Sequence, residues 1–173
     1  MSVTTDSPCC RSEAPMTASA VDRLPDLTLT DHDGRRLSTS ELLGDDATVL
    51  YLLRAAGCPV CIGHARALVA AHLAGRVPER IVLVVPGGSG EAATVRDKVV
   101  ARVAALPGTV RIVGSGDAHE AVGLQRTLML QHSGTVVVDA GHRVRYRRTA
   151  AMPTGSYSER DLTAALSALR RSA

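Results

Sequence analysis

Phenylalanine and tryptophan are absent from this 173-residue sequence, and three tyrosines bring the aromatic residues to only 2%. Proteins that bind single-stranded nucleic acid commonly stack the bases on aromatic side chains. The chain also lacks a strong excess of one charge, because its formal net charge is +3 at pH 7. Arginines gather in residues 143–148, but their alternation is typical of a strand with one solvated face. We therefore expect no nucleic-acid partner.

Long apolar runs are missing as well. No segment approaches the roughly 20 apolar residues that a membrane-spanning helix needs, and residues 1–22 lack the apolar core of a secretory signal. We expect a cytoplasmic protein without a membrane partner. The polar, aperiodic residues 1–22 predict a disordered N-terminal tail. Residues 23–173 are long enough for one domain with a single core.

Cysteine is scarce, and the four cysteines form two pairs, Cys9 with Cys10 and Cys58 with Cys61. Four cysteines at this length do not amount to a secreted disulfide scaffold. In a reducing compartment, a Cys-x-x-Cys pair is more often redox-active or metal-binding than structural. The pair in the tail has no periodic surroundings, which favours an unstructured pair and leaves open a mobile resolving thiol or a metal site.

Hydrophobic periodicity predicts alternating strands and helices after residue 23. Strands are expected at residues 24–30, 35–37, 48–53, 81–85, 109–113, 135–139 and 143–148. Helices are expected at residues 38–43, 60–75, 91–106, 118–124 and 158–169. The run 81–85 is typical of a strand buried on both faces of a parallel sheet, which implies a strand–helix–strand crossover before it. The spacing alone predicts an α/β fold with a mixed sheet and helices on both faces.

The most informative stretch joins the strand at residues 48–53 to the cysteine motif. The order strand, small-residue turn and helix places Cys58 at a helix N-terminus, where unpaired amides and the helix dipole stabilise a thiolate. A thiolate with a lowered pKa is a nucleophile near neutral pH. Pro59 suits the first helical turn. Cys61 lies one turn further on, within reach of a disulfide with Cys58.

Three segments carry a resemblance to a known family. They are Leu24-Pro25-Asp26-Leu27-Thr28-Leu29 with Asp33-Gly34-Arg35, Val49-Leu50-Tyr51-Leu52-Leu53-Arg54-Ala55-Ala56-Gly57-Cys58-Pro59-Val60-Cys61, and Thr135-Val136-Val137-Val138-Asp139-Ala140-Gly141. Together they resemble the redoxin and peroxiredoxin-like branch of the alkyl hydroperoxide reductase/thiol-specific antioxidant superfamily, closest to the peroxiredoxin-like 2 subgroup. The resemblance covers residues 24–169. It implies a thioredoxin-like three-layer α/β/α fold with a central mixed sheet and an N-terminal β-hairpin.

The resemblance also implies a thiol-dependent oxidoreductase without a cofactor. Cys58 would attack a peroxide or a disulfide, and Cys61 would resolve the product to a Cys58–Cys61 disulfide. Arg54 would hold the thiolate or an anionic substrate, unless it is simply a solvated strand end. A thioredoxin-type protein or a low-molecular-weight thiol would then reduce the disulfide. The protein would be a monomer or a homodimer.

Departures from the family pattern bear on the substrate. A typical peroxiredoxin has Pro and Thr upstream of its reactive cysteine and Arg downstream, where this chain has Arg54, Ala55 and Ser133. The residues that replace the thioredoxin cis-proline are His132 and Ser133. We expect Pro59, His132 and Ser133 to lie beside the substrate. The strand at residues 48–53 carries no carboxylate of the kind that helps thioredoxins to deprotonate the second cysteine.

A metal site is one rival interpretation. Cys58, Cys61 and His64 supply soft and borderline ligands at short spacing, and Cys9 with Cys10 could complete a zinc or copper shell. His64 also falls on the apolar stripe of its helix, which favours a partly buried histidine with satisfied hydrogen bonds over a ligand.

A second rival is a thioredoxin-fold protein that only binds partners, with His132 and Ser133 on its docking surface. Residues 86–90, Pro-Gly-Gly-Ser-Gly, follow a buried strand as a phosphate-binding loop would. They lack the Lys-Ser/Thr ending of a P-loop, which favours an ordinary strand-to-helix connection.

Overall fold

The computed structural model describes residues 22–103, 105–117, 119–122, 124–127 and 130–172. Apart from Asp22, the predicted tail lies outside these residues, and so do Cys9 and Cys10. Among the described helices, none is long and apolar enough to span a lipid bilayer.

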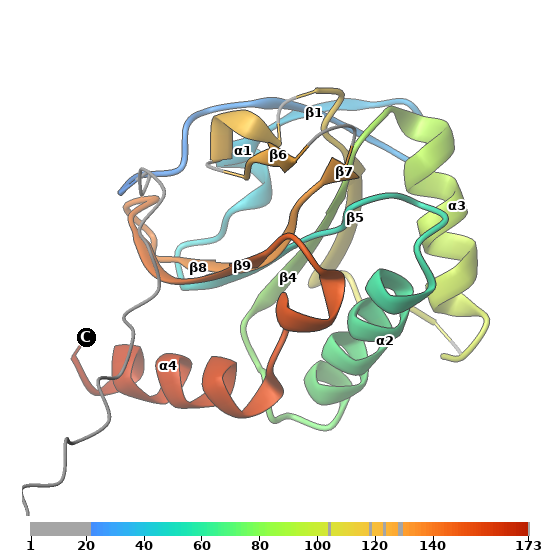
Figure 1. Ribbon diagram of the computed structural model, residues 1–173. Helices are drawn as coiled ribbons and strands as arrows, with labels where there is room; N and C mark the ends of the chain where they lie inside the picture. The colour runs from blue at the N-terminus through green and yellow to red at the C-terminus, as the bar shows by residue number, and fades with distance from the viewer. Residues whose placement is uncertain (1–21, 104, 118, 123, 128–129, 173) are drawn as a thin grey trace, which may run out of the picture.

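Seven strands form one mixed sheet in the order β2-β1-β5-β4-β3-β8-β9 (Figure 1). Their bounds are β1 (Thr28–Asp31), β2 (Arg36–Ser38), β3 (Thr48–Leu52), β4 (Arg80–Val85), β5 (Val110–Gly114), β8 (Ser133–Val138) and β9 (Val144–Ala150). The central strands β3, β4 and β5 are parallel, while β1 and β8 run antiparallel to their neighbours β5 and β3. A separate short hairpin, β6 (Arg126–Thr127) with β7 (Leu130–Gln131), was not expected from the sequence.

The helices are unequal in length and cover the two faces of the sheet unequally. They are α1 (Thr39–Leu42), α2 (Pro59–Leu73), α3 (Ser89–Val100) and α4 (Glu159–Arg171), with 3-10 turns η1 (Glu120–Val122) and η2 (Pro153–Gly155). Alternate residues of a strand point to opposite faces. Tyr51 and Leu53 therefore share a core with α2, α3 and α4, while Leu50 and Leu52 pack on the far face with residues of α1 and η1. The three-layer α/β/α prediction is confirmed, with a thin second helical layer (Figure 1).

The crossover from β3 through α2 to β4 positions the cysteine motif. β3 and β4 are parallel, with Leu52 opposite Val84, so α2 begins at the carboxyl edge of the sheet. β8 runs antiparallel to β3 and pairs Gly134 with Leu52. Ser133, the first residue of β8, is thereby brought beside the end of β3, where the chain turns toward Cys58.

Two helix predictions needed correction. The helix expected at residues 91–106 begins earlier, at Ser89, and ends at Val100. Val103 and Leu106 still pack against the core beyond the helix. The spacing of apolar residues in this segment therefore indicated which residues are buried, but it did not indicate a helix. Within the described part of the predicted helix at residues 118–124, only the turn η1 forms.

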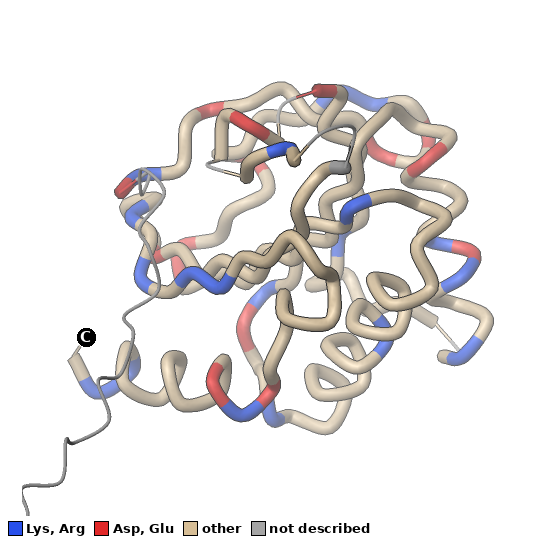
Figure 2. The backbone as a smooth tube through the Cα atoms, in the orientation of Figure 1, with Lys and Arg blue, Asp and Glu red and all other residues tan. Residues whose placement is uncertain are grey.

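The charged residues are interspersed along the chain, and both signs occur on the visible parts of the tube (Figure 2). Two arginines of β9 form ion pairs with carboxylates of neighbouring elements. Arg145 pairs with Asp139 at 2.6 Å, and Arg148 pairs with Asp161 at 2.7 Å. These two ion pairs tie β9 to the preceding turn and to α4.

Candidate active site

The geometry of Cys58 follows from the way α2 starts. After β3, the Cys58 amide donates to the Ala55 carbonyl at 3.2 Å and closes a turn. Cys58 then takes the extended N-cap conformation, with φ −72° and ψ 111°, and its sulfur accepts the Cys61 amide at 3.4 Å. Pro59 is the first residue of the helix and is exposed. The Cys58 sulfur thus occupies the capping position that a serine or aspartate oxygen fills in other helices.

The two thiols, both free, have opposite acidities. Cys58 is 8% exposed; burial opposes its ionisation, but hydrogen bonds from Cys61 and the Val60 amide, together with the charge of Arg54, lower its pKa. Cys61 is completely buried, and burial raises its pKa. Cys58 is therefore the better nucleophile, and Cys61 is a protonated neighbour within its reach.

Arg54 lies two residues beyond the end of β3 and is half-buried. Its positive charge is one of the causes that lower the pKa of Cys58. Its backbone amide also hydrogen-bonds toward Cys61 and lowers the pKa of that thiol against the larger effect of burial. The charge of the Arg54 side chain therefore acts on Cys58, whereas only its backbone amide acts on Cys61.

His132 and Ser133 have different surroundings. His132 is engaged with β6, since its Nε2 lies 2.7 Å from the Thr127 hydroxyl and its amide donates to the Gln125 carbonyl. Ser133 is fully buried, and its hydroxyl lacks a hydrogen-bond partner among the described residues. By strand alternation Ser133 shares a face with Thr135, which bonds the Ser156 carbonyl on the α2 side of the sheet.

A polar cluster on the inner side of Cys61 was not predicted from the sequence. The Tyr51 hydroxyl lies 3.1 Å from Nδ1 of His64 and 3.3 Å from the Ser156 hydroxyl. The ring of Tyr157 packs against the His64 ring, with centroids 5.4 Å apart. Tyr51 is a phenol in a largely aliphatic strand, which was a sequence signal for this cluster. His64 is partly buried and hydrogen-bonded, as its place on the apolar stripe of its helix favoured.

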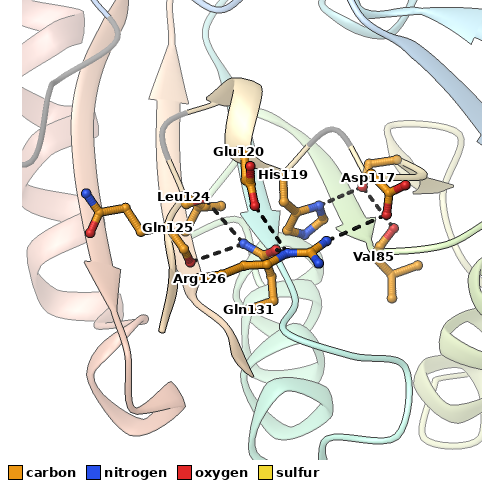
Figure 3. A network of polar contacts seen from close by, with 9 residues as sticks. Val85, Asp117, His119, Glu120, Leu124, Gln125, Arg126 and Gln131 are labelled. Carbon is orange, nitrogen blue, oxygen red and sulfur yellow. Dashed lines mark hydrogen bonds and ion pairs between the residues drawn. The ribbon is translucent and has the colours of Figure 1, made fainter. Parts of the chain in front are cut away.

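A second network supports the segment between β5 and β8 (Figure 3). His119 is fully buried and lies 3.0 Å from the Leu53 carbonyl through Nε2 and 2.6 Å from the Ser115 hydroxyl through Nδ1. Arg126 donates to Gln131 at 3.0 Å and pairs with Glu120 at 3.3 Å. Of these contacts, the one from His119 reaches Leu53, the residue that follows β3, while those of Arg126 join β6 to β7 and η1.

The metal-site interpretation gains no support from the described part of the chain, which does not include Cys9 and Cys10. Within the described ranges, no three His, Cys, Asp or Glu side chains are grouped to hold a metal ion. One cavity of about 380 Å³ lies between β1, α3 and β5, and another of the same volume lies beside Glu79 and Asp139. Neither cavity is lined by the cysteines.

Comparison with solved structures identifies the fold. A peroxiredoxin-like protein from Aquifex aeolicus matches with a TM-score of 0.66 at 13% identity, covering 86% of this chain and 85% of that one. Reduced Prx3 in complex with H₂O₂ from Vibrio vulnificus matches with a TM-score of 0.68 at 19% identity, covering 87% and 99%. Peroxidoxin BcpB from Mycobacterium tuberculosis matches with a TM-score of 0.61 at 22% identity, covering 86% and 96%.

No match to this sequence is found among curated proteins. The family model described as Redoxin, in contrast, matches residues 19–166, which include the cysteine motif and all seven strands of the main sheet. That match supports a thiol-dependent redox function in general terms. On this evidence, the chain belongs to the Redoxin family.

Proposed function

We propose that the protein is a thiol-dependent oxidoreductase that reduces peroxides, with Cys58 as the attacking thiolate and Cys61 as the resolving thiol. The observation that carries the proposal is the N-cap position of Cys58, whose sulfur accepts an amide hydrogen bond and whose pKa is lowered by its hydrogen-bond partners and Arg54 against the opposing effect of burial. A thiolate in that position is the reactive form of cysteine.

The reaction proceeds in two steps. The Cys58 thiolate attacks one peroxide oxygen, the O–O bond breaks, and the leaving oxygen takes a proton to become water or an alcohol, so that Cys58 is a sulfenic acid. Cys61 then attacks the Cys58 sulfur, an S–S bond forms, and the sulfenic oxygen leaves as water. A thioredoxin-type protein or a low-molecular-weight thiol supplies two electrons to restore the dithiol.

A small oxidant suits this site better than a large one. Cys58 is only 8% exposed, which admits a peroxide more readily than a folded protein disulfide. The unpartnered Ser133 hydroxyl supports a role as a hydrogen-bond donor to the peroxide, in place of the arginine of typical peroxiredoxins. A small disulfide is the second candidate substrate, because Pro59 and the start of α2 are exposed.

The test is a single turnover of the fully reduced protein with hydrogen peroxide, an organic hydroperoxide or a small model disulfide. Thiols are counted by alkylation and intact-mass measurement. We expect the loss of two thiols per chain, complete with a peroxide and slower with the disulfide. Cys58→Ser should abolish the reaction, and Cys61→Ser should stop it at the Cys58 sulfenic acid. Retention of both thiols in the wild type would refute the proposal.

A further inference from the structure

The only lysine of the chain, Lys98, reaches the loop that precedes Cys58. Lys98 lies near the end of α3, is half-buried, and donates from Nζ to the Ala56 carbonyl at 2.9 Å. Among the described residues it forms no ion pair, so its charge is directed at a neutral peptide oxygen. A hydrogen bond from a charged donor is stronger than one between neutral groups. The bond therefore ties α3 firmly to the loop before Cys58.

The backbone of Lys98 is anchored as well. Near the end of a helix, carbonyl groups lack partners within the helix. The Arg66 guanidinium supplies one here, because its Nε and Nη2 donate to the Lys98 carbonyl at 2.9 Å and 2.6 Å. Arg66 belongs to α2, the helix that Cys58 caps, and α2 packs beside α3 (Figure 1). Lys98 thus connects the loop before Cys58 with the helix after it.

The carbonyl that Lys98 binds belongs to the central peptide of a β-turn. The turn runs from Ala55 to Cys58 and is closed by the bond from the Cys58 amide to the Ala55 carbonyl at 3.2 Å. Turns of type I and type II differ by a flip of the central peptide, and type II needs a positive φ at the third residue. Neither Ala56 nor Gly57 has a positive φ, which is the pattern of type I. The Lys98 ammonium therefore contacts the peptide whose orientation distinguishes the two turns.

Gly57, the third residue of the turn, is not required by the conformation in which it lies. Its φ is not positive, and a Cβ at this position would meet no atom within 4 Å. Glycine does make the flipped type II turn accessible, since it adopts a positive φ without steric cost. The Ala56 side chain packs against the core, whereas Gly57 is exposed. The local sequence therefore permits two peptide orientations, and the contact from Lys98 favours one of them.

Cys58 depends on this turn for its place at the N-cap. Its amide closes the turn, and its sulfur accepts the Cys61 amide at 3.4 Å. Burial opposes the ionisation of Cys58, while hydrogen bonds from Cys61 and the Val60 amide, together with the charge of Arg54, lower its pKa. Hydrogen bonds weaken steeply when their geometry is lost. Movement of the turn that carries Cys58 would therefore weaken the stabilisation of its thiolate.

We propose that Lys98 is a positioning residue for Cys58, which it keeps at the N-cap by holding the peptide between Ala56 and Gly57 in one orientation. This inference rests on the proposed function, in which Cys58 is the attacking thiolate. In the flipped turn the Ala56 carbonyl points away from Lys98 and the bond from Nζ is lost. The Cys58 sulfur is then held less firmly against the amides that stabilise its negative charge. Lys98 acts on Cys58 through the turn.

The test measures the nucleophilicity of Cys58 with two reagents. Reduced full-length protein is alkylated with iodoacetamide over a range of pH, and peptide mass spectrometry follows Cys58 separately from the other cysteines. In parallel, the loss of the Cys58 thiol is timed after mixing with hydrogen peroxide. The variants are Lys98→Met, which keeps the aliphatic stem, and Lys98→Ala, which suits a helix. Arg96→Met is the matched control, because it removes an exposed cation from the same helix.

We expect Lys98→Met and Lys98→Ala to slow both reactions of Cys58 at pH 7 by about three- to tenfold, since a reactive state that is only partly populated lowers the rate by that fraction. The midpoint of the alkylation profile should move to higher pH in both variants. Arg96→Met should react as the wild type. Urea denaturation confirms that each variant is folded at pH 7 before the rates are compared.

A second substitution separates positioning from a loss of packing or charge. Alanine at position 57 disfavours the positive φ of the flipped turn by roughly five- to thirtyfold. In the double variant Lys98→Met with Gly57→Ala, the turn should therefore keep its orientation without the lysine. Its rates should recover to within about twofold of the wild type, because substitutions that act on one element are not additive.

The outcomes that count against the positioning role are distinct from those that count against the proposed function. Wild-type rates in both Lys98 variants would overturn the role of Lys98. A double variant as slow as Lys98→Met would do the same, since the loss would then come from charge or packing and not from the turn. A wild type that is alkylated at Cys58 but inert toward hydrogen peroxide would overturn the proposed function, whereas slower alkylation in Lys98→Met would still support the role of Lys98.

Discussion

At the scale of single residues, Cys58 and Cys61 are the same chemical group in two environments. The N-cap position exposes Cys58 to backbone amides and to the charge of Arg54, which lower its pKa although burial opposes them. One turn later Cys61 faces the core, where burial dominates and raises its pKa. The division of labour that we propose, with Cys58 as the attacking thiol and Cys61 as the resolving thiol, would thus arise from position along one helical turn.

Arg54 provides the prediction at this scale. In Arg54→Met, the loss of the nearby positive charge should raise the pKa of Cys58 and slow its alkylation by iodoacetamide at pH 7 by about three- to tenfold. The measurement is the alkylation rate of Cys58 as a function of pH, with the midpoint moved to higher pH. Arg35→Met removes the same charge from an exposed side chain between β1 and β2 and should leave the profile unchanged. If the pH profile of Cys58 alkylation in Arg54→Met matched those of Arg35→Met and the wild type, Arg54 would not act on Cys58.

At the scale of elements, the carboxyl edge of the parallel strands is tightly packed where β5 meets the loop after β4. A Cβ at Gly114, the last residue of β5, would lie 2.5 Å from the carbonyl oxygens of Gly87 and Gly88. Gly87 has φ +99° and pairs with Gly116 across this edge. Because backbone atoms cannot move aside as side chains do, glycine at position 114 permits the close approach of the two loops.

Two glycine substitutions test this packing in opposite directions. Gly114→Ala should lower the free energy of unfolding by about 1 to 3 kcal/mol or more, since overpacking costs that much in a well-packed core. Gly63→Ala, on the exposed side of α2 with no atom near its Cβ position, should raise the free energy of unfolding by about 1 kcal/mol through helix propensity. Urea denaturation at pH 7 measures both. A neutral Gly114→Ala would mean that the loop relaxes freely.

At the scale of the whole molecule, the buried His119 couples stability to pH. The Leu53 carbonyl can only accept a hydrogen bond, so the Nε2 of His119 carries the hydrogen and the Nδ1 accepts one from Ser115. Burial lowers the pKa of His119 from 6.5 to about 4. Between these values the unfolded chain binds a proton that the folded protein does not, so stability falls as the pH drops from 6.5 toward 4.

Urea denaturation at pH 7 and at pH 5 checks this coupling. The wild type should lose about 2 kcal/mol more of its unfolding free energy than His119→Gln does over this interval, from the linkage between proton binding and folding. His119→Gln should be less stable than the wild type at pH 7, because it loses packing and one hydrogen bond. Parallel losses in the two proteins would show that His119 is protonated in the folded state as readily as in the unfolded chain.

The sequence by itself determined the features that depend on neighbours along the chain. The strand leading to Cys58, the proline at the first position of α2, the Ser158 cap of α4 and the order of most elements follow from periodicity and capping, which act within a few residues. The proximity of Cys58 and Cys61 is local in the same sense, since one helical turn separates them. The α/β fold was predicted from these local patterns, and the Redoxin family from the resemblance carried by three segments; both are confirmed.

Only the tertiary structure decided which polar groups surround the thiols. Tyr51 meets Ser156 across 105 positions and His119 meets Leu53 across 66, contacts that form when the sheet and its two helical layers close. The early end of α3 has a similar origin. Val103 and Leu106, which were expected to be helical, pack against the core beyond the end of α3 at Val100. An apolar period reports which residues are buried but not what they are buried against, and the polar surroundings of the thiols depend on the latter.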